Sequence, residues 1–301
     1  MKRKHPERYL WSASNIAMVT AGNSTGDWSV NGISIDSRAI EKGDLFIAIK
    51  GPNHDGHNYV NEALAKGAVG AVVGVGYVDR LEIIPDLSRL VRVADTMTAL
   101  EDLAISARNR SQARIIAITG SVGKTSTKEA LKLALDATVD NLSKVCATKG
   151  NLNNHWGLPL SLAHLPRDAA YGVFEMGMNH RGEISPLSRM ARPHVAVITN
   201  VADTHSEYFG SFDRIADAKA EIFDGLTTDG VAILNRDNSM FQHLSIAARK
   251  AGVNRVCSFG SVPGADCRLV DMRLKPNGSD ITAEIEGKRF VYSLGAPGRH
   301  L

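Results

Sequence analysis

The chain has 301 residues, of which 44% are hydrophobic and 22% charged, and a formal net charge of +3. These values are typical of a two-domain globular protein, and so small a net charge argues against a nucleic-acid or membrane surface. The basic N-terminus is not followed by a clean apolar segment, which predicts a solvated tail instead of a signal peptide. The most apolar run, Ala68–Val78, is too short to span a bilayer. The three cysteines are widely spaced and lack metal-site spacing, so we expect a cytoplasmic protein.

The first third of the chain predicts a small α/β domain. Leu45–Ile49 and Val69–Val75 have the composition of buried strands, and Asn61–Lys66 between them has that of a helix. The polar stretch Arg108–Arg114 precedes the next apolar run, so we place the domain boundary there. The expected domains are residues 1–112 and residues 113–301.

The second region predicts a mostly parallel sheet, because strand-like runs alternate with helical segments. These runs are Ile115–Thr119, Tyr171–Glu175, Val195–Thr199, Val231–Asn235 and Arg255–Phe259. From Cys267 onward the pattern changes to period-2 alternation with turns at Pro276-Asn277-Gly278 and Glu286-Gly287, which indicates a small antiparallel subsheet. The expected fold class is α/β, with a doubly wound central domain.

The segment Ile115–Ser126, IIAITGSVGKTS, has the pattern of a phosphate-binding loop between a strand and a helix. Ile118 stands where the full Walker pattern has its first glycine, so the loop is the shortened form GxxGKT. Backbone N–H groups and the Lys124 ammonium suit a phosphate, and the Thr125 hydroxyl suits Mg²⁺. A glycine-rich turn that binds nothing is the alternative. The expected nucleotide ligands in the loop are Gly120, Ser121, Val122, Gly123, Lys124, Thr125 and Ser126.

Polar residues follow the other predicted strands, at the edge where ligands bind in doubly wound sheets. Glu175 ends one strand, His205 follows another, and Asn235 and Asp237 follow a third. Glu175 suits Mg²⁺ directly, and His205 suits a second ion as a less common ligand. A capping carboxylate and a surface histidine are the alternatives.

Lys219 falls inside an apolar stripe of helical spacing, four residues after Ile215 and four before Phe223. An isolated ammonium on a buried face is costly, so such a lysine should be paired or chemically altered. A side chain that extends past the stripe to water fits the pattern equally well.

Two further polar clusters suit substrate binding. Asn153 and Asn154 lie in a glycine-bounded loop, where a solvated turn is the alternative. Ser37 and Arg38 lie near a predicted strand in the first domain and suit a second phosphorylated ligand, although a surface ion pair with Asp36 explains the arginine as well.

Several ordered motifs together resemble the Mur ligases of peptidoglycan synthesis, from about Ile33 to the end of the chain. They include SIDSRAIEKGDLFIAIKGPNHDGH in the first domain, TGSVGKTS, GNLNNHWGLP, FEMGMNHRGEIS, RPHVAVITNVADTHSEYFGS and IADAKAEIF. The first-domain motif looks like the domain shared by the MurE and MurF branches, and TGSVGKTS like the phosphate loop of the whole family. The other four look like the MurF branch, which joins D-alanyl-D-alanine to UDP-N-acetylmuramoyl-tripeptide. His155-Trp156 departs from the acidic-aliphatic pair usual there.

The resemblance implies a monomeric ligase that uses ATP and Mg²⁺ and passes through an acyl phosphate. Thr125 and Glu175 would hold one Mg²⁺ and His205 a second, and Lys219 would be the lysine that is carbamylated in this family. The segment of Asn235 and Asp237 would lie near adenosine, and that of Ser37 and Arg38 near the uridine diphosphate. The family continues into a third domain, which we expect to be absent here, so the chain alone should be inactive. A MurE-type diamino-acid ligase, a non-catalytic nucleotide-binding module and a small-metabolite kinase remain the alternatives.

Overall fold

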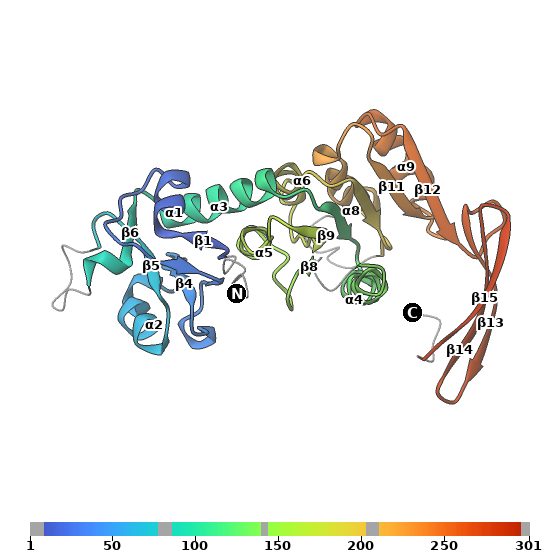
Figure 1. The fold of residues 1–301 in the computed structure, drawn as a ribbon. Coiled ribbons are helices and arrows are strands. Elements are labelled where there is room, and N and C mark those ends of the chain that lie inside the picture. The colour runs from blue at the N-terminus through green and yellow to red at the C-terminus, as the bar shows by residue number, and fades with distance from the viewer. Residues whose placement is uncertain (1–8, 78–85, 140–143, 203–210, 296–301) are drawn as a thin grey trace. The chain divides into compact units, whose positions relative to one another are not determined.

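The computed structural model describes residues 9–77, 86–139, 144–202 and 211–295 (Figure 1). The chain forms two compact units. The first contains Met1–Ser111 and Pro159–Arg167, and the second contains Gln112–Leu158 and Asp168–Leu301. Residues 159–167 thus return to the first unit from within the expected second domain. No helix in the described ranges combines the length and the apolarity needed to cross a membrane.

The first unit is built around a four-stranded parallel sheet in the order β3-β4-β5-β6. Its elements are β1 (Trp11–Ser12), α1 (Ala13–Val19), β2 (Ser29–Val30), β3 (Gly32–Ser34), η1 (Ser37–Ala39), β4 (Asp44–Ile47), η2 (Gly56–Tyr59), α2 (Val60–Lys66), β5 (Gly70–Gly74), η4 (Leu87–Arg89), β6 (Leu90–Val93) and α3 (Thr96–Arg110). The strands predicted near Leu45 and Val69 and the helix between them are β4, β5 and α2.

Most residues of these strands are buried, as is typical of parallel strands covered by helices, although Arg92 on β6 is exposed. Phe46 and Val73 pack with Val60 and Ala63 of α2 in one core cluster. At β1, the buried Trp11 donates a hydrogen bond of 3.0 Å from its indole nitrogen to the carbonyl of Ala163, in the segment that returns to this unit. That segment therefore completes the environment of a core aromatic residue.

The second unit is built around a nine-stranded sheet in the order β15-β14-β13-β12-β11-β10-β7-β9-β8. Its elements are β7 (Arg114–Thr119), α4 (Lys124–Asp136), β8 (Lys144–Ala147), α5 (Gly157–Ala163, shared with the first unit from Pro159), β9 (Ala169–Glu175), α6 (Ile184–Ala191), β10 (Val195–Ile198), α8 (Phe212–Ala220), η5 (Glu221–Gly225), β11 (Val231–Asn235), α9 (Phe241–Lys250), β12 (Arg255–Gly260), β13 (Cys267–Lys275), β14 (Gly278–Ile285) and β15 (Lys288–Leu294). The strands from β7 to β12 are parallel, and β13, β14 and β15 pair antiparallel. The predicted α/β class and the antiparallel subsheet are confirmed.

The connections of this sheet reverse their direction beside β7. The chain moves from β7 through α4 to β8 in one direction along the sheet, and later through α6, α8 and α9 in the other. Because parallel crossovers are right-handed, α4 covers one face and the later helices cover the opposite face (Figure 1). Adjacent strands β7 and β10 thus lead to opposite faces, which is the switch point where α/β sheets bind ligands.

Candidate functional site

The loop between β7 and α4 has the backbone of a phosphate-binding turn. Gly120 and Gly123 have φ angles of 153° and 85°, the second in the left-handed region that favours glycine. A Cβ on Gly120 would lie 2.0 Å from the Thr199 hydroxyl oxygen, so only glycine fits there. The end of β10 fixes the loop from the side, because the Thr199 hydroxyl donates a 2.6 Å hydrogen bond to the Val122 carbonyl. Ser121 donates from its backbone to Asn200 at 2.9 Å.

Lys124 begins α4 and is folded back over the loop. Its Nζ donates to the carbonyl of Gly120 at 2.6 Å. Burial lowers the pKa of this ammonium below its ordinary value, and the nearby Glu175 carboxylate partly opposes the shift. The lysine thus supplies a partly desolvated cation at the turn where N–H groups and a helix N-terminus favour an anion.

Glu175 is a buried carboxylate at the end of β9, only 2% exposed. Thr125 donates from its hydroxyl to Glu175 Oε2 at 3.0 Å, and Asn153 donates from Nδ2 to Oε1 at 2.9 Å. The Lys124 ammonium is the nearby positive charge that interacts with this carboxylate. Hard oxygen donors at Thr125 and Glu175 fit Mg²⁺. The described residues contain no cluster of three or more histidine, cysteine or acidic side chains, and His205 lies outside them.

Lys219 is buried on α8, with 4% of its surface exposed, so it does not extend past the apolar stripe to water. Desolvation lowers the pKa of its amine from 10.5 to about 7, and the positive charge of Lys124 adds to the shift. The two lysines are therefore electrostatic neighbours. An amine with this pKa is substantially neutral near pH 7, and a neutral amine is a nucleophile.

Asn235 and Asp237, which follow β11, have different roles in the structure. Asn235 donates from Nδ2 to the Thr199 carbonyl at 3.1 Å, which links the end of β11 to the strand that supports the phosphate loop. Asp237 instead accepts from the backbone of Ser261 and Val262 at 2.7 and 3.0 Å, and so fixes the turn after β12. Asn235 is thus joined to the loop, and Asp237 to the neighbouring turn.

The asparagines before α5 also separate into two roles. Asn153 contacts Glu175, as described above. Asn154 accepts from the backbone N–H groups of Trp156 and Gly157 at 3.2 and 2.9 Å. It therefore acts as a cap at the start of α5, because an asparagine side chain satisfies N–H groups that lack helical partners.

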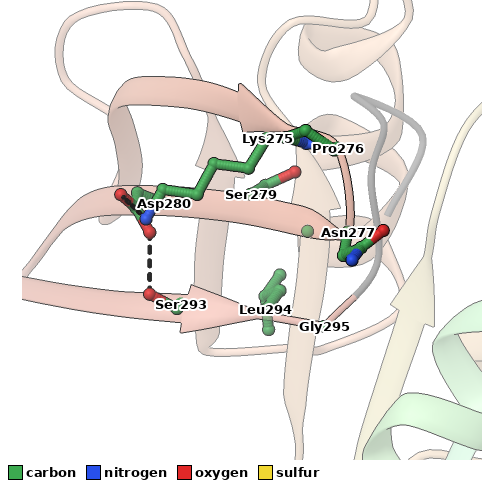
Figure 2. Close-up of a pocket in the computed structure, with 9 residues that line it drawn as sticks. Lys275, Pro276, Asn277, Ser279, Asp280, Ser293, Leu294 and Gly295 are labelled. Carbon is green, nitrogen blue, oxygen red and sulfur yellow. Dashed lines mark hydrogen bonds and ion pairs between the residues drawn. The ribbon is translucent and has the colours of Figure 1, made fainter.

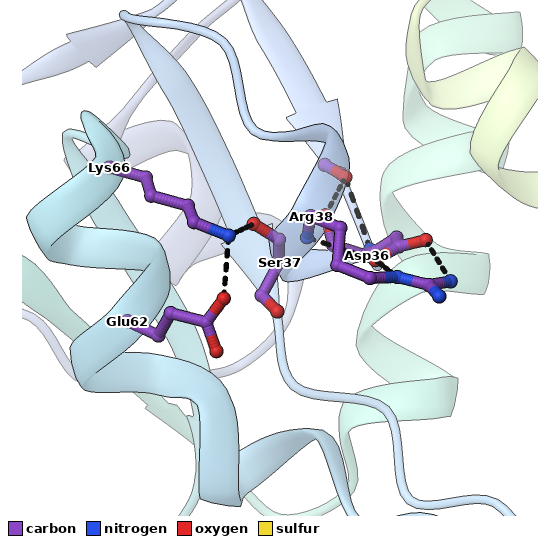
Figure 3. Close-up of polar contacts among 6 residues, drawn as sticks. Asp36, Ser37, Arg38, Glu62 and Lys66 are labelled. Atoms are coloured by element: carbon purple, nitrogen blue, oxygen red, sulfur yellow. Dashed lines mark hydrogen bonds and ion pairs between the residues drawn. The ribbon is translucent and has the colours of Figure 1, made fainter.

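In the first unit, Arg38 forms a two-pronged ion pair with Asp36 (Figure 3). Its Nε and Nη2 donate to the two carboxylate oxygens at 2.9 and 2.7 Å, and this interaction lowers the pKa of Asp36 to about 2. The arginine side chain is 84% exposed. Ser37 is buried, and its carbonyl accepts from Lys66 at 3.3 Å. The guanidinium is accessible to a ligand. It also forms the surface ion pair with Asp36 that the sequence offered as the alternative to ligand binding.

A hollow of about 400 Å³ lies at the tip of the antiparallel subsheet (Figure 2). It is lined by Lys275, Asn277, Asp280, Ser293 and neighbouring residues of the β13–β15 turns. None of the residues predicted for nucleotide or metal binding lines it, and it belongs to the opposite edge of the sheet from β8 and β9. It is not part of the candidate site.

Three residues of the candidate site were not predicted from the sequence. Thr199 supports the phosphate loop, Thr148 accepts a hydrogen bond from the backbone N–H of Glu175, and Lys128 donates to the carbonyl of Thr148. The sequence could have indicated Lys128, since it follows Lys124 by one helical turn and so lies on the same face of the helix. The sequence could not have indicated Thr148, because the short strand β8 before it was not predicted.

Comparisons with known proteins agree with this geometry. The Mur ligase middle domain matches residues 118–301, and the domain described as the Mur ligase family, catalytic domain, matches residues 29–108. The curated UDP-N-acetylmuramoyl-tripeptide–D-alanyl-D-alanine ligase of Rickettsia prowazekii is 37% identical over 87% of this chain and 56% of its own length. The Escherichia coli protein of the same name is 36% identical over 91% and 58%.

Solved structures give the same result. A crystal structure of MurF from Acinetobacter baumannii is similar with a TM-score of 0.79 and 33% identity, over 96% of this chain and 62% of that one. MurF from Thermotoga maritima in complex with ADP has a TM-score of 0.71 and 29% identity, over 89% and 58%. The chain thus spans little more than half the length of the curated relatives it matches.

The middle-domain match alone covers more than half of the chain, and it includes the phosphate loop from Ile118, Glu175 and Lys219. Because this match coincides with a parallel sheet whose switch point carries that loop, the chain belongs to the Mur ligase family.

Proposed function

We propose that this chain binds ATP and UDP-N-acetylmuramoyl-tripeptide, as part of a ligase that joins the tripeptide to D-alanyl-D-alanine. The single observation that carries the proposal is the contact between the phosphate loop and Glu175, in a chain with relatives that bear this ligase name. The second unit would hold ATP, and the first unit would hold the UDP-sugar through the region of Ser37 and Arg38.

The chemistry assigned to the described residues is positioning and charge stabilisation. The tripeptide carboxylate would attack the γ-phosphorus of ATP, and the bond to ADP would break. The loop N–H groups and Lys124 would stabilise the charge that develops on the phosphoryl oxygens. The amine of D-alanyl-D-alanine would then attack the acyl phosphate, lose a proton and displace inorganic phosphate.

Thr125 and Glu175 would hold Mg²⁺, which supplies neutralisation of phosphate charge when it is bound. The Thr125 hydroxyl and the Asn153 amide each donate a hydrogen bond to one oxygen of Glu175. The carboxylate is thus oriented, which reduces the cost of ordering it on binding. His205 and a carbamylated Lys219 remain proposed participants.

The test is a pair of measurements, the first on the purified chain and the second, with hydroxylamine, on the complete ligase. Calorimetric titration should detect binding of ATP with Mg²⁺ and of UDP-N-acetylmuramoyl-tripeptide, with weaker binding of the corresponding dipeptide. Incubation with ATP, the tripeptide substrate and hydroxylamine tests the acyl phosphate, because hydroxylamine converts it to a hydroxamate. Preference for the dipeptide would favour a diamino-acid ligase. A stable phosphorylated product that hydroxylamine does not trap would favour a kinase.

A further inference from the structure

Lys128 is a fully buried lysine to which the proposed reaction assigns no role. It lies on α4, one turn after Lys124, and none of its surface is exposed. Its Nζ donates to the carbonyl of Thr148 at 2.8 Å and lies 2.9 Å from a carboxylate oxygen of Glu129. Glu129 is itself more than half exposed, so the pair consists of a buried cation and a solvated anion.

Thr148 connects this ammonium to Glu175. The threonine is buried, and its backbone N–H donates to the carbonyl of Val173 on β9 at 3.1 Å. Its hydroxyl oxygen accepts from the backbone N–H of Glu175 at 3.0 Å. The threonine side chain thus extends the pairing of β8 with β9 beyond the end of β8, up to the residue that carries the candidate metal ligand.

Stability does not require an ammonium in this position. A buried cation has a desolvation cost that an apolar side chain of similar size avoids, and such replacements are often neutral or stabilising. The penalty of leaving a buried partner charge would not arise here, because Glu129 is solvated. The Thr148 carbonyl would lose a donor, at a cost of about 1–3 kcal/mol that the relieved desolvation of the ammonium offsets. Lys128 does provide a fixed link between the phosphate-loop helix and the main chain that precedes Glu175.

Glu175 is therefore joined to α4 by two routes. Thr125 contacts its carboxylate directly, and Lys128 contacts Thr148, which holds its backbone. We propose that Lys128 is a positioning residue that acts through Thr148. It fixes the position of Glu175 relative to the phosphate loop, so that the carboxylate can bind the magnesium ion of MgATP. This inference rests on the proposed function, since it assumes that the loop binds ATP.

The test compares the affinity for a non-hydrolysable ATP analogue with Mg²⁺ and in EDTA, for the full chain and for Lys128→Met. The ratio of the two affinities is the gain due to Mg²⁺. Groups that orient metal ligands typically change metal affinity by about 10–100-fold. We expect the variant to lose about tenfold of this gain, with nearly unchanged affinity in EDTA and a similar free energy of unfolding. Lys132→Met is the matched control, because Lys132 is one turn further along α4, is partly exposed and pairs with Asp136.

Equal weakening in both solutions, or a variant that does not fold, would assign Lys128 to general stability and overturn the proposal. A wild-type chain without any gain from Mg²⁺ would contradict the proposed function itself. A wild-type gain that Lys128→Met retains in full would contradict only the role of Lys128.

Thr148 provides an independent check of the same route. Thr148→Val keeps the shape but removes the acceptor of the Glu175 N–H, so it should lose the Mg²⁺ gain as Lys128→Met does. Thr148→Ser keeps the hydroxyl and should retain the wild-type gain in affinity due to Mg²⁺. Combining Lys128→Met with Thr148→Val should cause little further loss, because both would act on one connection. Additive losses would show two separate effects and contradict the proposed route.

Discussion

Thr125 and Glu175 lie 50 residues apart in the chain, and a 3.0 Å hydrogen bond joins the threonine hydroxyl to the glutamate carboxylate. Thr125 is in the first turn of α4, and Glu175 is the last residue of β9. The contact requires that β9 lie directly beside β7, in the register that pairs Ile118 with Glu175. The strand order of the sheet thus brings the phosphate loop and the buried acid together.

Replacing Lys124 with alanine should weaken ATP binding by this chain without unfolding it, and the same change in the complete ligase should abolish ATP turnover. Hydrogen bonds to charged groups contribute about 1.5–3 kcal/mol, so we expect a loss of about 10–100-fold in affinity. Calorimetric titration measures the affinity, and chemical denaturation checks the fold. Lys132→Ala is the control on the same helix. Wild-type affinity in Lys124→Ala would show that the loop does not bind the phosphates.

Gly123→Ala should damage both stability and nucleotide binding, whereas Gly252→Ala should damage stability alone. Both glycines have φ close to +85°, and a side chain in this region costs about 1–2 kcal/mol. Gly252 follows α9 and has open space where a Cβ would point. Urea denaturation should therefore give similar losses for the two variants. ATP titration should separate them, and equal ATP affinities would place the phosphate elsewhere.

Burial of Lys219 predicts that the stability of the protein rises between about pH 7 and pH 10. The pKa of this amine is about 7 in the folded chain and near 10.5 when unfolded, so the unfolded state binds more protons in this interval. The cost of the buried cation is fully present below pH 7 and is relieved as pH rises through the folded pKa.

The measurement is the free energy of unfolding of the wild type minus that of Lys219→Met, in buffers free of carbon dioxide. Other titrating groups cancel in this difference. The difference should increase with pH across the interval. A flat difference would mean that Lys219 ionises as it does in water.

Lys219 should also form a carbamate when carbon dioxide is present. The neutral amine reacts with CO₂, loses a proton and becomes an anion, which removes the unfavourable buried cation. NMR of protein incubated with ¹³C-bicarbonate should show a carbamate signal that is absent in Lys219→Met. If the proposed ligase reaction is measurable, Lys219→Ala should impair it far more than ATP binding, and acetate should partly restore it. No labelled signal above pH 7 would refute the modification.

Arg38→Ala should weaken binding of UDP-N-acetylmuramoyl-tripeptide about tenfold and leave stability nearly unchanged. The ion pair with Asp36 is exposed, and exposed pairs contribute about 0–1 kcal/mol. A charged contact to a diphosphate contributes more, and its effect should diminish as salt is added. Arg92→Ala removes an exposed arginine from β6 of the same sheet and serves as the control. Equal affinities of the two variants would leave Arg38 with the ion pair as its only role.

The sequence predicted those elements whose pattern is local. The runs at Ile115, Tyr171, Val195, Val231 and Arg255 are all strands, because a buried parallel strand is apolar along its whole length. The short strands β6 (LVRV) and β8 (KVCA) were not predicted, since a charged residue interrupts or begins each run and leaves at most three consecutive apolar residues. The polar residues Arg108–Arg110, expected in a linker, form the last turn of α3.

The candidate site was predictable to the extent that strand ends identify it. The phosphate loop and Glu175 follow from that rule, but their contact depends on strand order, which no local pattern contains. The pattern around Lys219 left burial and exposure equally open, and only the packing of α8 decides between them. Asn153 and Asn154 are adjacent and chemically identical, yet one contacts Glu175 and the other caps α5.

The first unit is encoded by two separate gene segments, because residues 159–167 return to it. A recombination event that joined the gene segment for residues 1–111 to another nucleotide-binding domain would separate Trp11 from its acceptor at Ala163. The indole N–H would then be buried without a partner, at a cost of about 1–3 kcal/mol. An exchange that keeps the first unit intact must therefore carry residues 159–167 together with residues 1–111.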